Sequence, residues 1–301
     1  MSQIVAASPH VTTKNSTAVI MRDVLIALLP AVLAGCVVFG LRALLVVTVT
    51  TAACVFFEWG FEKLCHTPST ISDLSAAVTG VLLAMNLPVS IPLWQAVFGA
   101  LVAIVAVKGL FGGIGKNFAN PALVGRIVLF LSFSKTMTAW VFPDAVSSAT
   151  PLAQLAAGQK PELWTLLLGN HGGCIGETCA LALLLGGAYL LLRGVITWQT
   201  PVCFVGTVFV LSLILGQDAV RQILSGGLLL GAFFMATDYV TAPQTCWGRA
   251  LFGIGAGLLT CLIRFYGSYA EGVSFAILFM NILTPYLSKW TRSKPLGGVP
   301  A

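Results

Sequence analysis

Long apolar stretches alternate with short polar or turn-rich segments along the whole chain. A helix needs about 20 mainly apolar residues to cross a bilayer. The third, fifth and eighth stretches fall short of that length, and short interrupted segments at matching places in two halves indicate a functional region near the bilayer midplane. The pattern predicts ten membrane helices, at residues 23–41, 43–61, 72–87, 93–111, 121–133, 177–193, 201–216, 222–236, 247–265 and 272–288.

The two halves of the chain carry a related sequence. Residues 80–92 read Gly-Val-Leu-Leu-Ala-Met-Asn-Leu-Pro-Val-Ser-Ile-Pro, and residues 231–243 read Gly-Ala-Phe-Phe-Met-Ala-Thr-Asp-Tyr-Val-Thr-Ala-Pro, at a constant separation of 151 positions. Five helices in each half is an odd number, so the halves must enter the membrane in opposite orientations. The expected fold class is therefore an all-α polytopic membrane protein with two inverted five-helix repeats.

Polar segments set the expected boundaries between the parts of the chain. The longest of them lies near the middle of the sequence and separates the two repeats. The predicted parts are an N-terminal arm (1–21), a first five-helix repeat (22–134), a polar loop (135–176), a second five-helix repeat (177–289) and a C-terminal tail (290–301).

Composition and charge agree with a membrane protein and predict its orientation. Only 9% of the residues are charged and 57% are hydrophobic, whereas a soluble domain carries about 25% charged residues. With the N-terminus inside, eleven Lys and Arg fall on the inner side and five on the outer side, as the positive-inside rule requires. We therefore expect a multi-pass membrane protein, with both termini in the cytoplasm and the 135–176 loop outside. The net charge of +6 indicates contact with membrane lipid and not with nucleic acid.

Three charged residues lie deep in the predicted helices and are candidate functional groups, because charge inside a bilayer is costly. Glu58 has Glu62 one turn further on, so the pair is either a station for a cation or proton or an interfacial pair that reaches water. Asp238 follows a helix C-terminus, where a carboxylate opposes the helix dipole and needs a cation, a donor or a hydrated cavity. Arg126 could hold a phosphate or carboxylate, or contact lipid phosphate. Glu58 and Asp238 are the predicted ion-path residues.

The histidines and cysteines predict no metal site. The three histidines are far apart in sequence, and none of the eight cysteines forms a Cys-x-x-Cys pair, so the spacing of a zinc or iron–sulfur site is missing. Cys174 and Cys179 lie together outside the predicted helices, where they could form a local disulfide, take part in redox chemistry or remain small buried thiols.

A cluster of small and hydroxyl residues stands out in the central polar loop: Asp144, Ser147, Ser148, Ala149 and Thr150, followed by Pro151. Taken alone, this pattern is typical of a helix N-cap with proline in the first turn. It contains no histidine, so it predicts no catalytic residue by itself.

Motifs along the whole length resemble those of one protein family. The chain resembles the D subunit of the Rnf ion-translocating electron-transport complex and, more distantly, the B subunit of the Na⁺-pumping NADH:quinone reductase. The two most specific motifs are Ser-Ser-Ala-Thr at 147–150 and Phe-Met-Ala-Thr-Asp at 234–238; the others are Ser-Pro-His at 8–10, Met-Arg-Asp at 21–23, Phe-Glu at 57–58 and Gly-Lys-Asn-Phe-Ala-Asn-Pro-Ala at 115–122.

The resemblance implies a covalent cofactor on the central loop. In this family a flavin mononucleotide (FMN) is esterified through its phosphate to the threonine of such a motif, which here is Thr150. Asp144 would assist the transfer, and Ser147, Ser148 and Ala149 would leave room for the flavin transferase. The best-known form of the motif has glycine where this chain has Ser148, which is also small. A second, non-covalent flavin, riboflavin, occurs in some members of the family.

The resemblance also implies a function, a fold and partners. The expected function is that of a membrane subunit of a ferredoxin:NAD oxidoreductase, an ion-translocating enzyme complex that moves Na⁺ or H⁺. The other Rnf subunits (A, B, C, E and G) would be its partners, with the second flavoprotein, G, as the nearest neighbour. The family's fold resembles that of urea transporters. The alternative function is therefore a urea-type solute channel without a redox cofactor, which explains the repeat but not the Ser-Ser-Ala-Thr loop.

Overall fold

The structure is a computed structural model that describes residues 16–140, 150–267 and 272–292. Asp144, Ser147, Ser148 and Ala149 of the predicted attachment motif, and most of the N-terminal arm, lie outside the described residues. The described part is helical and contains no strand, apart from an isolated bridge between Pro88 and Cys174. This confirms the all-helical class.

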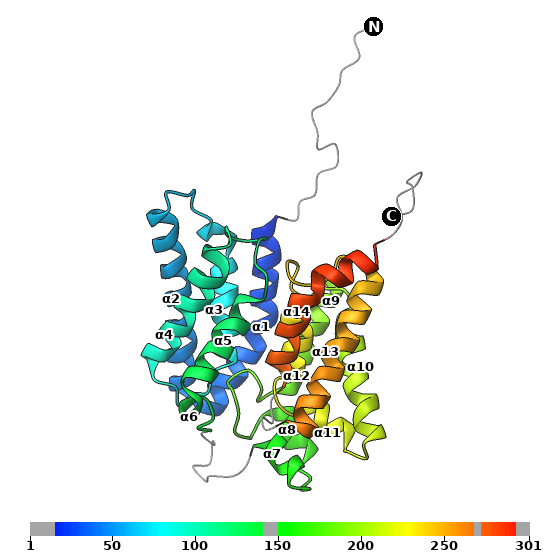
Figure 1. The fold of residues 1–301 in the computed structure, drawn as a ribbon. Coiled ribbons are helices and arrows are strands. Elements are labelled where there is room, and N and C mark those ends of the chain that lie inside the picture. The colour runs from blue at the N-terminus through cyan, green and yellow to red at the C-terminus, as the bar shows by residue number, and fades with distance from the viewer. Residues whose placement is uncertain (1–15, 141–149, 268–271, 293–301) are drawn as a thin grey trace, which may run out of the picture.

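The first half of the chain forms one helical bundle (Figure 1). Pro92 stands directly before α4, and Asn120 caps α5 by accepting a hydrogen bond from the Ala122 N–H at 3.0 Å, with Pro121 in the first turn. The elements are α1 (Thr17–Phe39), α2 (Leu41–Leu64), the 3₁₀ turn η1 (Ile71–Asp73), α3 (Ser75–Met85), α4 (Leu93–Leu101), its π-helical continuation η2 (Val102–Gly109), α5 (Pro121–Ser132) and α6 (Ser134–Met137).

The second half forms a second bundle beside the first, joined to it by two short helices, α7 (Pro151–Ala156) and α8 (Leu163–Leu168). The bundle itself contains α9 (Ala180–Leu192), α10 (Gln199–Ile214), α11 (Ala219–Leu224), α12 (Leu228–Leu230), its π-helical continuation η3 (Gly231–Met235), α13 (Cys246–Tyr266) and α14 (Val273–Trp290). The helix predicted to begin at residue 177 begins at Ala180, because the residues before it are held by contacts with the first bundle.

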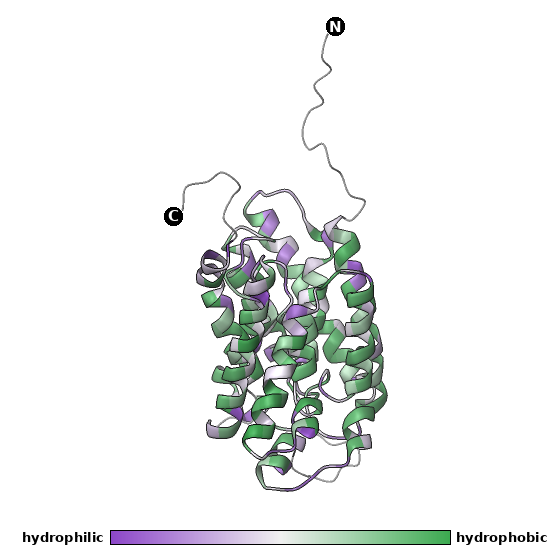
Figure 2. Ribbon diagram, turned by 90° about the vertical axis from the view of Figure 1, so that its right-hand side faces the viewer, coloured by the Kyte–Doolittle hydropathy of each residue, from purple (hydrophilic) through white to green (hydrophobic). Residues whose placement is uncertain are grey.

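The outer surface is apolar, as a membrane environment requires. Among the described residues, α1, α2 and α13 are long and apolar enough to cross a bilayer, and five shorter apolar helices accompany them. Hydrophobic residues cover most of the length of these helices (Figure 2). Large apolar side chains such as Val37 and Leu192 are 84% and 88% exposed, which would be unfavourable in water. The chain is therefore a polytopic membrane protein.

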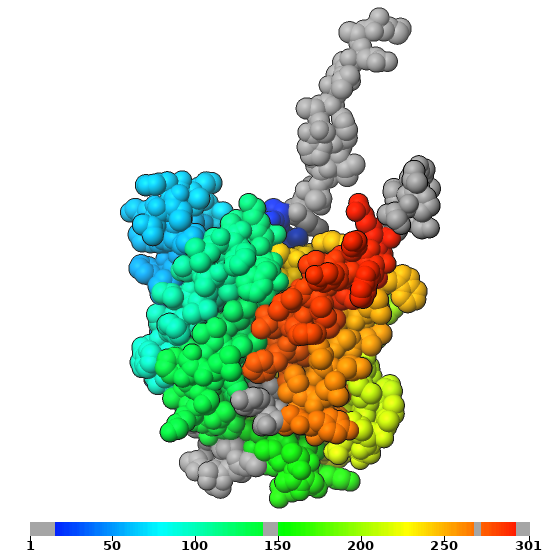
Figure 3. Space-filling view, in the orientation of Figure 1, coloured from blue at the N-terminus to red at the C-terminus, as the bar shows by residue number. Residues whose placement is uncertain are grey.

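The two ends of the described chain lie at the same end of the molecule. Figure 1 places the start of α1 and the end of α14 at the same end of the molecule, with α6, α7, α8 and α11 at the opposite end. The two bundles meet along a seam that runs between these ends (Figure 3). Contacts of α1 with α9 and of α5 with α14 hold the seam together.

The α1–α9 contact depends on a glycine without a side chain. A Cβ on Gly186 of α9 would lie 2.2 Å from the Ala27 carbonyl oxygen of α1, whereas a Cβ on Gly206 of α10 would meet nothing within 4 Å. We expect Gly186→Ala to destabilise the protein by about 1–3 kcal/mol, because the two helices must separate. Gly206→Ala should leave stability unchanged or raise it by up to about 1 kcal/mol. Thermal unfolding in detergent measures both; equal melting midpoints would contradict this account.

Candidate functional site: a cavity between the two bundles

A cavity of about 350 Å³ lies between the two bundles. The first turns of α1 line it, so it lies near the end of the molecule where the described chain begins and ends. Most of its wall is apolar, from Val24, Leu82 and Phe233 among others. The polar groups of the lining come from both bundles and include Ser75, Lys108, Asn117, Asn120, Thr237 and Asp238.

Two π-helical segments bring charged residues to this cavity. In η2 the Leu110 N–H donates to the Val105 carbonyl at 3.0 Å, and in η3 the Ala236 N–H donates to the Gly231 carbonyl at 2.7 Å. These i to i−5 bonds widen the helix, and such turns occur frequently at functional sites. Lys108 lies within η2 and Asp238 follows η3 closely.

Asp238 lies where its carboxylate has both a donor and a cavity. Its Oδ2 accepts a hydrogen bond from the Thr241 hydroxyl at 3.0 Å, and its side chain lines the cavity. The sequence predicted that a carboxylate after a helix C-terminus needs a cation, a donor or a hydrated cavity, and the Thr241 hydroxyl is such a donor. Asp238 and Lys108 therefore reach the same space from opposite bundles.

Glu58 is buried in an ion pair with Lys108. Only 5% of Glu58 and 3% of Lys108 is exposed, and the Lys108 ammonium donates to Glu58 Oε1. Glu62 is 9% exposed and accepts the Thr70 N–H at 2.9 Å. The interpretation of Glu58 and Glu62 as an interfacial pair that reaches water is therefore wrong, because the chain after α2 folds back over both carboxylates.

A second buried ion pair lies at the junction of the bundles. Arg126 donates to Asn86 Oδ1 at 2.7 Å and to the Ser274 hydroxyl at 2.9 Å, and its Nη2 lies 3.5 Å from Glu177 Oε1. Because Arg126 is 5% exposed, its side chain contacts protein groups and not lipid phosphate. Arg126 thus joins α3, α5, α14 and the segment before α9.

The segment before α9 enters the interior of the molecule. The Ile175 N–H donates to the Leu87 carbonyl at 3.1 Å and the Gly176 N–H to the Met85 carbonyl at 2.7 Å. A Cβ on Gly176 would lie 2.7 Å from the Met85 side chain, so only glycine allows this approach. Cys174 and Cys179 are not joined by a disulfide, and Cys174 is buried beside Arg126. The described end of the central loop therefore packs against the C-terminus of α3.

The ends of the two repeated motifs also meet. Asn86, which caps the C-terminus of α3, places its Nδ2 3.6 Å from the sulfur of Met235 at the end of η3. Asn120 Nδ2 donates to the Met235 carbonyl at 3.4 Å. The two short helices that carry the related sequences thus end at one point between the bundles.

Thr150 lies at the other end of the molecule from the cavity. It is the N-cap of α7, where its hydroxyl accepts a hydrogen bond from the Ala153 N–H at 3.4 Å and Pro151 occupies the first turn. Its side chain is half-buried. A cavity of about 190 Å³ lies beside α7, lined by apolar Leu152 and Leu155 and by polar Gln222 and Arg264. The structure therefore does not bring Thr150 together with Glu58 or Asp238.

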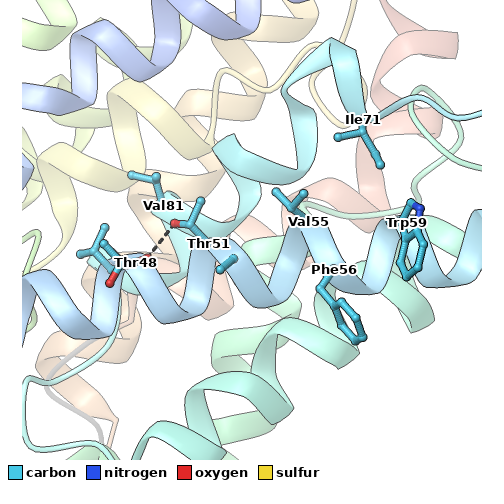
Figure 4. Close-up of a pocket in the computed structure, with 9 residues that line it drawn as sticks. Thr48, Thr51, Val55, Phe56, Trp59, Ile71 and Val81 are labelled. Atoms are coloured by element: carbon cyan, nitrogen blue, oxygen red, sulfur yellow. Dashed lines mark hydrogen bonds between the residues drawn. The ribbon is translucent and has the colours of Figure 1, made fainter.

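A larger groove of about 740 Å³ follows the side of α2 (Figure 4). It is lined mainly by apolar side chains such as Val55, Phe56 and Trp59, and the Thr51 hydroxyl in its wall donates to the Val47 carbonyl at 2.7 Å. No ionisable side chain lines it, so it offers surface for apolar contacts and no group for proton or ion chemistry.

Sequence reasoning missed the partners of its own candidates. Glu58 is paired with Lys108, Glu62 accepts a hydrogen bond from Thr70, and Arg126 is paired with Glu177. None of these three partners was predicted as a site residue. A lysine inside the predicted helix 93–111 was a usable signal, because a charge there requires a partner. Within the described ranges, no group of three or more His, Cys, Asp and Glu side chains is arranged to hold a metal ion.

Fold and site together define a polytopic helical membrane protein with buried ionisable groups between its bundles, the arrangement expected of transport and ion-translocating proteins. Residues 4–297 match the NQR2, RnfD, RnfE family, and the chain belongs to that family. It is 46% identical, over 97% of its length and 95% of the relative's, to the D subunit of the Na(+)-translocating ferredoxin:NAD(+) oxidoreductase complex of Acetobacterium woodii. It is 41% identical, over 97% and 96%, to the D subunit of the proton-translocating ferredoxin:NAD(+) oxidoreductase complex of Clostridium ljungdahlii.

Proposed function

We propose that this protein is the D subunit of an Rnf complex, a membrane flavoprotein within an ion-translocating ferredoxin:NAD oxidoreductase. The observation that carries the proposal is the similarity to relatives of that name over nearly the whole of both chains. In this function the chain relays electrons and contributes to Na⁺ or H⁺ movement, with the other Rnf subunits (A, B, C, E and G) as partners and G as the nearest neighbour. The two relatives are named for different ions, so the family name does not identify the ion.

Thr150 is the proposed attachment point of covalent FMN. Thr150 is half-buried at the start of a short helix, and a threonine hydroxyl can form the phosphoester. Leu152 and Leu155 offer apolar surface to a flavin ring, while Gln222 and Arg264 offer polar contacts beside it. When bound, a flavin supplies one- and two-electron chemistry, while the protein supplies position and electrostatics. Asp144, Ser147, Ser148 and Ala149 remain proposed contacts of the transfer step.

The cavity between the bundles is the proposed site of a second, non-covalent flavin, riboflavin. Its wall combines apolar side chains with hydroxyl, amide, ammonium and carboxylate groups, which suits a flat amphipathic ligand. Glu58 and Asp238 are the proposed ion-path residues. Asp238 lines this cavity, and Glu58 is paired with Lys108, which also lines it.

We also propose the inverted-repeat membrane topology. In each half, two helices and a short turn or helix precede the element that carries the related sequence, and those elements, α3 and η3, end at one point. Both ends of the described chain lie at one end of the molecule, with α7 and α8 at the other, which supports cytoplasmic termini and an extracytoplasmic flavin loop in the inner membrane. A urea-type channel is disfavoured, because relatives similar over nearly the whole chain are named as subunits of ferredoxin:NAD(+) oxidoreductase complexes.

The test uses the complex purified through a tag on this chain and reconstituted in sealed vesicles. We expect ferredoxin oxidation to drive NAD⁺ reduction with ion movement across the membrane. Asp238→Asn should slow ion movement by about tenfold or more while electron transfer with an uncoupler persists, because the cavity loses a carboxylate charge. Thr241→Val, which removes only the hydroxyl donor, should have a smaller effect. Solute permeability without oxidoreductase activity would contradict the proposal, and unchanged pumping in Asp238→Asn would remove this residue from the path.

A further inference from the structure

Two buried carboxylates share one hydroxyl near the end of α2. Glu58 and Glu62 lie one turn apart and are 5% and 9% exposed. The Thr70 hydroxyl is 3.3 Å from Glu58 Oε1 and makes a shorter contact with Glu62 Oε1. In each carboxylate the second oxygen, Oε2, is buried and has no hydrogen-bond partner among the described residues. A buried oxygen acceptor without a partner is unfavourable, so the pair is set up for a group that the polypeptide does not supply.

The charges around this pair do not balance. The Lys108 ammonium bonds Glu58 and also the Ser75 hydroxyl at 2.5 Å, and that hydroxyl donates to the carboxylate of Asp73. One buried ammonium is thus present for two buried carboxylates, Glu58 and Glu62, while the partly exposed Asp73 carboxylate is bonded to it only through Ser75. Lys63 follows Glu62 in sequence, but its ammonium lies 5.0 Å from the centre of the Trp59 ring and its side chain is exposed. Burying excess negative charge is costly, so the pair requires a further positive charge.

Lys108 connects these carboxylates with the cavity. Lys108 and Ser75 both line the cavity between the bundles, and the Lys108 side chain arises from the π-helical segment η2. A lysine ammonium is a compact charge on a flexible four-carbon chain. It can therefore bond Glu58 or turn towards the cavity without a change in the backbone.

We propose that Glu58, Glu62 and Thr70 form a binding site for a monovalent inorganic cation such as Na⁺, and that the Lys108 ammonium is a tethered competitor for the same carboxylate oxygens. The inference deepens the proposed ion-translocating function and rests on it. Carboxylate and hydroxyl oxygens are suitable ligands for a hard cation. Two buried carboxylates beside one buried ammonium leave a single net negative charge, which favours a singly charged ion over a divalent one. When the cation is absent, Lys108 neutralises one of the two buried carboxylates.

The test measures ²²Na⁺ binding to the purified full chain in detergent, in choline buffer at constant ionic strength and fixed pH. Wild type should bind Na⁺ saturably. Lys108→Met should bind it about tenfold more tightly, because the competing charge is gone, and Glu62→Gln should lose binding. Lys63→Met, which removes an exposed ammonium one residue from Glu62, is the matched control and should bind like wild type.

The proposal is overturned by no saturable Na⁺ binding in either wild type or Lys108→Met, by weaker binding in Lys108→Met, or by wild-type affinity in Glu62→Gln. A melting midpoint that responds to pH but not to Na⁺, with no bound ²²Na⁺, would assign the missing charge to a proton and also overturn it. Lys108→Gln replaces Lys108→Met if the latter is not monodisperse. Na⁺ binding is measured without ferredoxin or NAD, so it is independent of the oxidoreductase activity. If the chain joins the complex and carries flavin but binds no Na⁺, the cation-site inference is wrong and the proposed function is unaffected.

Discussion

Thr150→Asn is expected to give a folded protein that carries no covalent flavin. Thr150 has two roles that this substitution separates, because it caps α7 and is the proposed site of the phosphoester. Asparagine is among the best N-cap residues, so α7 should be retained, but its amide cannot form a phosphate ester. On a denaturing gel under ultraviolet light, wild type expressed with a flavin transferase should fluoresce, and the Thr150→Asn band should be dark.

Two further variants make this result specific. Thr150→Ala removes both the cap and the hydroxyl, so it should lose fluorescence and also about 1 kcal/mol of stability. Thr138→Ala, at an exposed threonine on the loop side of α6, should fluoresce like wild type. A fluorescent Thr150→Asn band would place the flavin on another residue. A dark wild-type band from cells that contain the transferase would contradict covalent attachment of flavin to this protein.

Arg126→Met is expected to cost roughly 3–5 kcal/mol of stability, the usual cost of leaving a buried charge without its partner. Arg126 holds Asn86, Ser274 and Glu177 at the junction of the bundles, and both side chains of the ion pair are 6% exposed. The loss should appear as a large fall of the melting midpoint in detergent. Adding Glu177→Gln to Arg126→Met should restore part of the loss, because the double variant no longer buries a lone carboxylate.

The matched control is another arginine in an ion pair that water reaches. The side chains of Arg221 and Asp218 are 21% and 25% exposed, so water can solvate the partner that remains. Arg221→Met should cost at most about 1 kcal/mol. If Arg126→Met and Arg221→Met have equal melting midpoints, the contacts of Arg126 do not hold the two bundles together.

The apolar pattern predicted the helical class and most helix positions, because a bilayer forces main-chain groups to bond within helices. The exact residues at which individual helices begin were less predictable. Asn120 and Pro121 act as a helix start as their types suggest, whereas the helix expected from residue 177 begins at Ala180. That boundary depends on Gly176, whose N–H bonds to Met85 of the first bundle, a contact that no local pattern encodes.

The sequence by itself determined the membrane class, the family motifs and the identity of the rare charged residues, because each follows from residue type and order alone. Only the tertiary structure decided how those charges are paired. Glu58 meets Lys108 fifty positions along the chain and Arg126 meets Glu177, because in a low-dielectric interior every buried charge needs a partner, wherever in the chain that partner lies. It also separated Thr150 from the cavity that Lys108 and Asp238 share, since the distance between the ends of a helical bundle follows from packing and not from sequence order.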